Sequence, residues 1–341
     1  MKFGVFDHVD ASGEALGQHL ATRLDLAEVY DQCGLYGYHV AEHHGTPLGH
    51  APSPSVLLSA VSQRTTTLRI GPLVYLLPLY HPLRLIEEIC MLDQLSDGRF
   101  MLGVGKGVSP FELGFYGADP ETAQAHYQET LDCILQGLTS DTLTFNGQHS
   151  RFDNVPMTLR PVQQPHPPLW YGAINPESAV WTATNAVNIV TIALAEGGRA
   201  LTDRYRAEWE KLGRDPAELP LMGISRHVVV ADTEGEAKRM AARAYALWRA
   251  NFVKLWHEAG VDVPFISALY PETWDALEAI GNGFAGTAEQ VADYVHAESE
   301  AAGVNYFVSW FAFGDLTFEQ AARSARLFSR QVIPAFEPNA I

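Results

Sequence analysis

Two adjacent histidines are the first candidates for proton chemistry in this chain. His43 and His44 follow Glu42 directly after a short apolar run, and neighbouring side chains on extended backbone point in opposite directions. We therefore expect only one of the two imidazoles to face a site at the end of that run. A neutral imidazole titrates near physiological pH, which suits a general acid or base. Position alone, however, favours a structural hydrogen-bonding role for a histidine.

A second group of residues has the chemistry to hold an anion. Lys106 stands in the glycine-rich stretch 102–107, where missing side chains let a flat ligand or a phosphate approach the backbone. Asn175, followed by proline, predicts a helix start whose free N–H groups on Glu177 and Ser178, with the Ser178 hydroxyl, bind phosphate. Each pattern also has a plainer explanation, a tight turn for the glycines and an ordinary capped helix for Asn175.

Aromatic residues at the ends of the first and last apolar runs are candidates for the wall of a pocket. Phe6, Trp310 and Phe311 are expected to line a substrate site, although closing the core is an alternative role for them. Near the seventh run, Arg226 and His227 alternate in direction. One of the two must face inward, and the sequence does not say which.

The elements that position these residues are predicted from hydrophobic patterning. Short apolar runs, typical of strands buried on both faces, alternate with segments of 3.6-residue apolar spacing. Eight such repeats predict a single-domain (β/α)8 barrel over residues 1–341, with an open doubly wound sheet as the alternative. The runs are residues 3–6, 38–41, 68–77, 100–104, 169–172, 187–193, 221–230 and 304–311.

Two stretches interrupt this alternation. Residues 139–167 are rich in proline and turn formers and are predicted to be an insertion before the fifth strand. Residues 232–285 are predicted to be a mostly helical insertion between the seventh and eighth strands. In a barrel of this kind the site lies at the carboxyl ends of the strands, where the candidate residues above other than Arg226 and His227 are found.

Composition excludes several classes of partner. The net charge of −17, from 23 Lys and Arg against 40 Asp and Glu, disfavours binding to nucleic acid or to anionic membranes. No apolar stretch is long enough to span a membrane, and the N-terminus does not resemble a signal peptide. Cys33, Cys90 and Cys133 are far apart, so we expect a reducing cytoplasm and no disulfides. Neither the cysteines nor the histidines have metal-site spacing, so no metal is expected.

Several motifs together resemble one family. The opening MKFGVF, the AEHH at 41–44, the segment from His81 to Gly107 and the NPESA at 175–179 are similar to the bacterial luciferase-like flavin monooxygenases. The resemblance extends over nearly the whole chain, and its most specific part is the segment 81–107. It implies a (β/α)8 barrel, often dimeric, that uses reduced FMN and O2 to oxygenate a small apolar or aromatic molecule through a flavin hydroperoxide.

The resemblance also assigns roles to residues. It implies that His43 is the catalytic residue above the flavin ring, and that a non-proline cis peptide joins Leu73 to Val74 beneath it. It implies a mobile active-site lid at 262–283. The cofactor-binding residues expected from the resemblance and from the helix start are Leu73, Val74, Gly105, Lys106, Ala173, Asn175, Glu177 and Ser178.

One departure from the family pattern concerns the phosphate. Lys106 replaces one family arginine, and a second has no equivalent, the nearest matches being Gln124 and His126. This predicts weak retention of FMN and delivery of reduced FMN by a separate flavin reductase. Three alternatives remain open: a deazaflavin-dependent hydride-transfer enzyme, a metal-dependent barrel hydrolase and a non-catalytic flavin-binding subunit. No light emission is expected.

Overall fold

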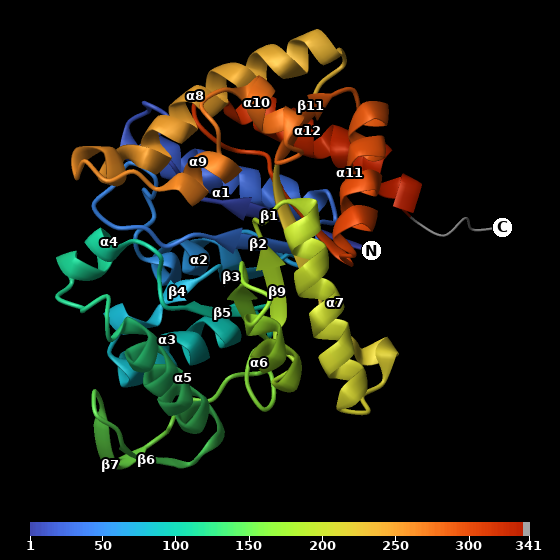
Figure 1. Ribbon diagram of the computed structural model, residues 1–341. Helices are drawn as coiled ribbons and strands as arrows, with labels where there is room; N and C mark the ends of the chain where they lie inside the picture. Colours follow the sequence, from blue (N-terminus) through green and yellow to red (C-terminus); the bar gives the residue numbers. More distant parts are fainter. Residues whose placement is uncertain (337–341) are drawn as a thin grey trace.

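The computed structural model describes residues 1–336 and contains a closed ring of parallel strands surrounded by helices (Figure 1). The sheet runs in the order β3-β2-β1-β12-β10-β9-β8-β5-β4, and a parallel bridge between Ile70 and Phe100 brings β3 beside β5. That bridge closes the ring, so the predicted barrel is confirmed and the open doubly wound sheet is excluded. The strands of this sheet are β1 (Lys2–Asp7), β2 (Gly37–Val40), β3 (Arg69–Pro72), β4 (Tyr75–Leu76), β5 (Leu102–Gly105), β8 (Leu169–Gly172), β9 (Asn188–Thr191), β10 (Met222–Val230), β11 (Gly283–Gly286) and β12 (Tyr306–Trp310).

The helices pack their apolar faces on the outside of this ring. In α5, Tyr127, Leu131, Ile134 and Leu138 recur every three or four residues, and all four are buried. Helices α11 and α12 each begin with a complete capping box, which satisfies backbone N–H groups at the helix start. The helices are α1 (Leu16–Gln32), α2 (Pro54–Ser62), α3 (Pro82–Leu95), α4 (Pro110–Phe115), α5 (Ala123–Thr139), α6 (Ser178–Thr184), α7 (Ala195–Lys211), α8 (Glu234–Glu258), α9 (Pro264–Leu269), α10 (Trp274–Ala279), α11 (Ala288–Ala302) and α12 (Phe318–Leu327).

The third predicted run, 68–77, is two strands rather than one. The peptide bond between Leu73 and Val74 is cis, as the resemblance implied, and it separates β3 from β4. Strand β5 passes very close to this junction. A Cβ on Gly103 would lie 1.9 Å from the carbonyl oxygen of Pro72, and one on Gly105 would lie 2.5 Å from Cγ2 of Val74. The glycines of this stretch are therefore needed first for strand packing.

The two predicted insertion regions have different structures. Residues 139–167 contain an antiparallel hairpin of β6 (Thr142–Asn146) and β7 (Arg151–Pro156), which lies at the opposite end of the view in Figure 1 from α8. Residues 232–285 contain α8, α9 and α10, and end in β11. This strand was not predicted. Strand β11 pairs with β10 from His227 to Val230. Strand β12 pairs with β10 only as far as His227, so β11 supplies partners for the backbone groups in the last part of β10.

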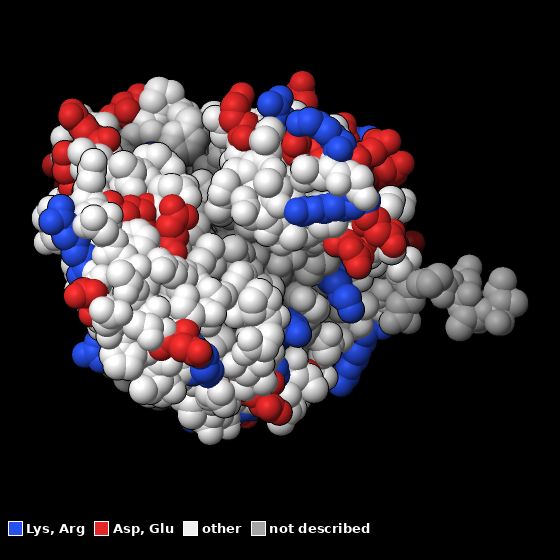
Figure 2. All heavy atoms as spheres, turned by 90° about the horizontal axis from the view of Figure 1, so that it is seen from below, with Lys and Arg blue, Asp and Glu red and all other residues white. Residues whose placement is uncertain are grey.

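Three expectations from the sequence concern nucleic acid, membranes and metal ions. On the face seen in Figure 2, acidic and basic side chains of the described residues are interspersed, and no extended basic patch covers it. None of the helices formed by residues 1–336 combines the length and hydropathy needed to cross a membrane. The same residues contain no group of three or more His, Cys, Asp or Glu side chains suited to holding a metal ion. The predicted domain extends to residue 341, and its last five residues lie outside the described part.

Candidate active site

A cavity of about 480 Å³, here called the mouth cavity, opens at the carboxyl ends of the barrel strands. Its walls come from the residues that end β1, β2, β5, β8 and β12 and from the β3–β4 junction. The structure therefore brings together side chains that are far apart in sequence. The predicted site residues that line it are Phe6, His43, Leu73, Val74, Gly105, Lys106, Asn175, Ser178 and Trp310.

Three predicted residues do not line this cavity. Phe311 is wrong as a substrate wall, because its ring packs on Phe328 and Tyr30, at centroid distances of 5.3 and 6.3 Å. Since side chains alternate along β12 and beyond its end, Trp310 faces the cavity and Phe311 faces the surrounding helices. Ala173 is fully buried, and Glu177 also lies outside the lining.

The turn before α6 uses the N–H groups that were predicted to be free for a phosphate. The Glu177 N–H donates to Oδ1 of Asn175 at 3.1 Å, and the Ser178 N–H donates to the carbonyl oxygen of Asn175 at 3.0 Å. The Ser178 hydroxyl donates to the same carbonyl oxygen at 2.6 Å. Asn175 therefore caps this turn, and the prediction of free N–H groups is wrong. Lys106, by contrast, is exposed at the cavity edge and makes no ion pair with any of residues 1–336.

His43 is paired with a carboxylate that the sequence did not reveal. Its Nδ1 lies 3.1 Å from Oε1 of Glu112, a buried residue in the first turn of α4. The same Glu112 oxygen accepts the His44 backbone N–H at 2.7 Å. Burial acts to raise the pKa of Glu112, but His43 and the hydrogen bonds outweigh it and lower that pKa. Glu112 is therefore a carboxylate that accepts the His43 Nδ1–H, and Nε2 is the ring nitrogen without a hydrogen-bond partner among residues 1–336.

His44 points away from the cavity into a separate hydrogen-bonded chain. Its Nε2 lies 2.8 Å from Oε1 of Glu42, and its Nδ1 lies 2.9 Å from the hydroxyl of Tyr116. The other oxygen of Glu42 accepts from the Tyr80 hydroxyl at 2.8 Å. The two histidines thus have different roles, as alternation predicts. His43 is in contact with the cavity, and His44 fixes the backbone that carries it.

Two further histidines lie among aromatic rings near the site. The His8 ring centroid is 5.4 Å from that of His43, and Nδ1 of His8 accepts from Nε1 of Trp248 at 3.3 Å. Burial, with His43 and His227 nearby, lowers the pKa of His8 well below its usual value, so this ring is neutral. His227 faces inward against Trp310 at 4.1 Å, whereas Arg226 faces outward to Glu298. The structure thereby answers which of residues 226 and 227 points into the barrel.

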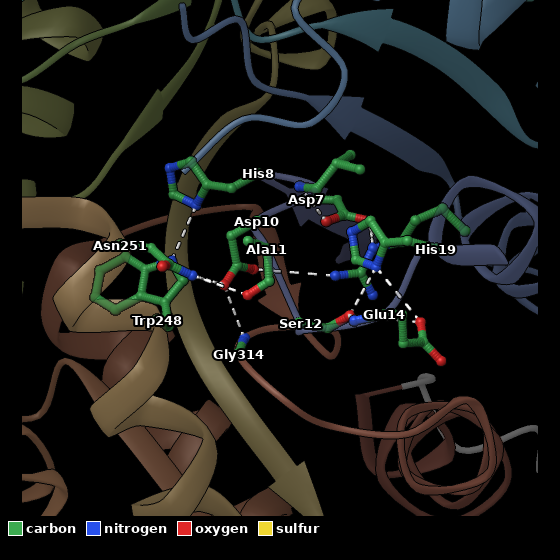
Figure 3. A network of polar contacts seen from close by, with 12 residues as sticks. Asp7, His8, Asp10, Ala11, Ser12, Glu14, His19, Trp248, Asn251 and Gly314 are labelled. Atoms are coloured by element: carbon green, nitrogen blue, oxygen red, sulfur yellow. Dashed lines mark hydrogen bonds and ion pairs between the residues drawn. The ribbon is translucent and has the colours of Figure 1, made fainter. Parts of the chain in front are cut away.

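A buried polar network attaches the helical insertion to the barrel (Figure 3). Asp10, in the loop after β1, accepts from Nδ2 of Asn251 in α8 at 3.3 Å and from the Gly314 N–H at 3.0 Å. Arg23 lies 3.9 Å from the other oxygen of Asp10. Burial nevertheless raises the pKa of Asp10 to about 7. The network fixes α8 against the loops that follow the first and last strands of the ring.

A second cavity, here called the inner chamber, lies between these loops and the helical insertion. It has a volume of about 170 Å³ and shares Phe6, His43, Glu112 and Trp310 with the mouth cavity. Sequence reasoning missed most of its wall, although the aromatic residues on the apolar face of 248–256 were an available signal. The insertion contributes Phe252, Leu255, Trp256, Phe265, Ile266 and Tyr270.

Comparisons with known proteins identify the family of this chain. A family model described as luciferase-like monooxygenase matches residues 1–306. The uncharacterized protein y4wF of Sinorhizobium fredii is 41% identical over 334 residues, which cover 98% of this chain and 96% of that protein. The oxygenase component of the flavin-dependent trigonelline monooxygenase of Acinetobacter baylyi is 26% identical, covering 100% of this chain and 97% of that one.

A solved structure shares the fold. The oxygenating constituent of 3,6-diketocamphane monooxygenase from Pseudomonas putida, solved in complex with FMN, superposes with a TM-score of 0.81 at 21% identity. The match covers 99% of this chain and 99% of that chain.

Proposed function

The chain belongs to the luciferase-like monooxygenase family, and from this premise we propose that it is the oxygenase component of a two-component flavin-dependent monooxygenase. The substrates are reduced FMN, O2 and a small organic molecule. The observation that carries this proposal is the His43–Glu112 pair, 3.1 Å apart, at the junction of a wide and a narrow cavity. A wide cavity suits a cofactor ring, and a narrow one suits a substrate beside it.

The residues of the mouth cavity fit FMN. Its volume of about 480 Å³ lies within the roughly 300–1,000 Å³ of ligand pockets in general. Leu73, Val74 and Gly105 would hold the flavin ring, since all three line this cavity at the junction of β3, β4 and β5. Lys106, with the side chains of Asn175 and Ser178, would hold the phosphate. The N–H groups at the start of α6 would join them only if the Asn175 turn opens.

When bound, reduced FMN supplies the oxygen-activating chemistry. The chain supplies proton handling and exclusion of water. Glu112 holds the Nδ1–H of His43, so that Nε2 is available to take or return one proton. The apolar wall of the inner chamber keeps bulk water from the reacting centre. Residues 262–283, predicted to be a lid, contain α9 and α10 and contribute Phe265 and Ile266 to that wall.

Weak retention of the cofactor supports a separate reductase. Among residues 1–336, Lys106 is the one cationic side chain that lines the mouth cavity. Gln124 and His126 do not line it, and the ring of His126 stacks on His149 at 4.3 Å instead. A single exposed lysine holds a phosphate loosely, which suits a cofactor that arrives reduced and leaves oxidised. A homodimer, as the resemblance implies, in the reducing cytoplasm that the scattered cysteines predict, is part of this proposal.

The same feature favours FMN over a deazaflavin with a long anionic tail, because such a tail needs several cations. Anaerobic titration with each reduced cofactor, followed by rapid mixing with oxygen, tests the choice. We expect reduced FMN to bind, to consume oxygen and to produce a transient absorbance of oxygenated flavin. Binding of the deazaflavin alone, with no oxygen uptake, would refute the proposal.

The His43→Ala variant separates an enzyme from a flavin-binding subunit. We expect it to bind reduced FMN within a few-fold of wild type and to lose product formation by at least about a hundredfold, the usual range for a general acid or base. An unchanged rate would favour the non-catalytic subunit. Elemental analysis covers the hydrolase alternative, because stoichiometric zinc or manganese with no response to flavin would support it.

A further inference from the structure

The inner chamber has features that restrict which molecule it accepts. Its walls come from two parts of the chain, the barrel residues around His43 and the insertion residues of α8 and α9. Phe6, His43 and Trp310 belong to both cavities, so a molecule in the chamber lies directly beside whatever fills the mouth cavity. The chamber is therefore the place for the molecule that reacts.

Size is the first restriction. A dry cavity of about 150 Å³ accommodates benzene, and the chamber measures about 170 Å³. One six-membered ring with a small substituent fits this space with room to spare, whereas two fused rings would fill most of it. The walls are largely aromatic, including Phe252, Trp256 and Tyr270, and flat rings pack on them at low cost.

Charge is the second restriction. The lining includes no lysine or arginine among the described residues, and its one formal negative charge is the buried carboxylate of Glu112. Burial, together with its neighbours His43 and His227, keeps His8 neutral. A carboxylate on the ligand would lose its hydration without gaining a cation, and it would lie near Glu112. The chamber thus disfavours anions.

Hydrogen bonding is the third restriction. Nδ1 of His43 is paired with Glu112, and Nε2 has no hydrogen-bond partner among residues 1–336. When Nδ1 alone carries a proton, Nε2 is an acceptor. A bound molecule therefore satisfies it by donating a hydrogen bond, as a hydroxyl does and an ether does not.

From these three restrictions we propose that the inner chamber binds an uncharged molecule with one six-membered ring that carries a hydrogen-bond-donating group directed at His43. This inference rests on the proposed function for the identity of the chamber as a substrate site. Its physical content, a selection by size, charge and donor, concerns binding and does not depend on turnover.

Four ligands test the three restrictions by calorimetry on the full chain, with and without saturating oxidised FMN. We expect 4-methylphenol to bind, and 4-methylanisole, which lacks the donor, to bind at least fivefold more weakly. We expect 4-hydroxybenzoate, which adds a carboxylate, and 2-naphthol, which adds a ring, each to bind at least tenfold more weakly. Equal or tighter binding of the anion or of the two-ring ligand would overturn the proposal, as would no binding of 4-methylphenol under either condition.

Wall variants link the size limit to the chamber. Leu255→Ala and Trp256→Ala enlarge it, and we expect each to improve 2-naphthol binding at least fivefold, with circular dichroism confirming the fold. Leu212→Ala changes an exposed leucine after α7 and should leave every affinity unchanged. If the wall variants fold but gain no affinity for 2-naphthol, the size argument is wrong. Binding of 4-methylphenol without any oxygen uptake by reduced FMN would contradict the proposed function and leave this inference standing.

Discussion

The Glu112→Gln substitution is the most direct test of how the site handles protons. Oε1 of the carboxylate lies 3.1 Å from Nδ1 of His43 and accepts the His44 N–H at 2.7 Å, whereas Oε2 lies 3.4 Å from the same Nδ1. A glutamine keeps the shape, and its oxygen takes the Oε1 position, where the two N–H groups point. The substitution therefore removes the negative charge that holds the His43 Nδ1–H and puts an NH2 group in the place of Oε2.

The expected magnitude follows from the type of hydrogen bond that is lost. A hydrogen bond to a charged group contributes about 1.5–3 kcal/mol. The Glu112 side chain is only 4% exposed, so solvent screens little of this energy. At about 1.4 kcal/mol per factor of ten, we expect product formation to slow by about 10- to 150-fold.

The assay measures two quantities on the same protein. Titration gives the affinity for reduced FMN, which should change less than threefold because Glu112 acts on His43 and on substrate. Single-turnover product formation after mixing with oxygen should show the whole loss. Glu121→Gln, at an exposed carboxylate between α4 and α5, should change neither quantity. A folded Glu112→Gln variant with wild-type turnover would refute the reasoning that this carboxylate positions His43.

The remaining predictions concern the cofactor, the strand packing and pH. Lys106→Ala should weaken the binding of reduced FMN about tenfold at low salt, measured by titration. The affinity of this variant should also depend less on salt concentration than that of the wild type. An unchanged affinity would show that Lys106 does not contact the phosphate. Gly103→Ala should lower the melting temperature strongly, because the added Cβ would lie 1.9 Å from a backbone oxygen. Gly114→Ala adds a Cβ in open space and should leave the melting temperature unchanged. Equal melting temperatures for the two variants would contradict this prediction. Because burial raises the pKa of Asp10 from 3.8 to about 7, this group's stabilisation is complete below pH 4 and is lost as pH rises through about 7, by up to about 4 kcal/mol. Melting at pH 5 and pH 8 should therefore differ less in Asp10→Asn than in wild type or in the exposed control Asp132→Asn, and an unchanged difference would exclude Asp10 as the source.

The overall fold could be predicted because the apolar pattern of each strand and helix is contained in a short stretch of sequence and is repeated along the chain. Eight buried runs alternate with amphipathic segments; each run overlaps a strand of the ring, and the run 68–77 contains two. The division of 68–77 was less accessible, since it depends on how closely β5 passes Pro72. Strand β11 was missed because Gly283–Gly286 has little apolar patterning, and its pairing with β10 is a property of the assembled sheet.

The site was predictable where function follows from position at a strand end. His43, Lys106 and Trp310 all lie at the carboxyl ends of strands and reach the mouth cavity. Phe311 was wrong because alternation places it on the opposite face from its neighbour. Glu112 was missed because it lies 69 residues from His43, and no local sequence pattern indicates that the two side chains form a pair. Only the fold brings them together.

The two cavities draw their walls from different stretches of the chain, and this has an evolutionary consequence. The mouth cavity is built from strand ends that also close the ring, so changes there endanger folding. One side of the inner chamber is built from α8 and α9, attached through Asn251 and the paired edge of β10. Mutations in that module would reshape the inner chamber while leaving the strand ends intact. Under the proposed function, libraries confined to α8 and α9 are therefore the natural route to new activities on this scaffold.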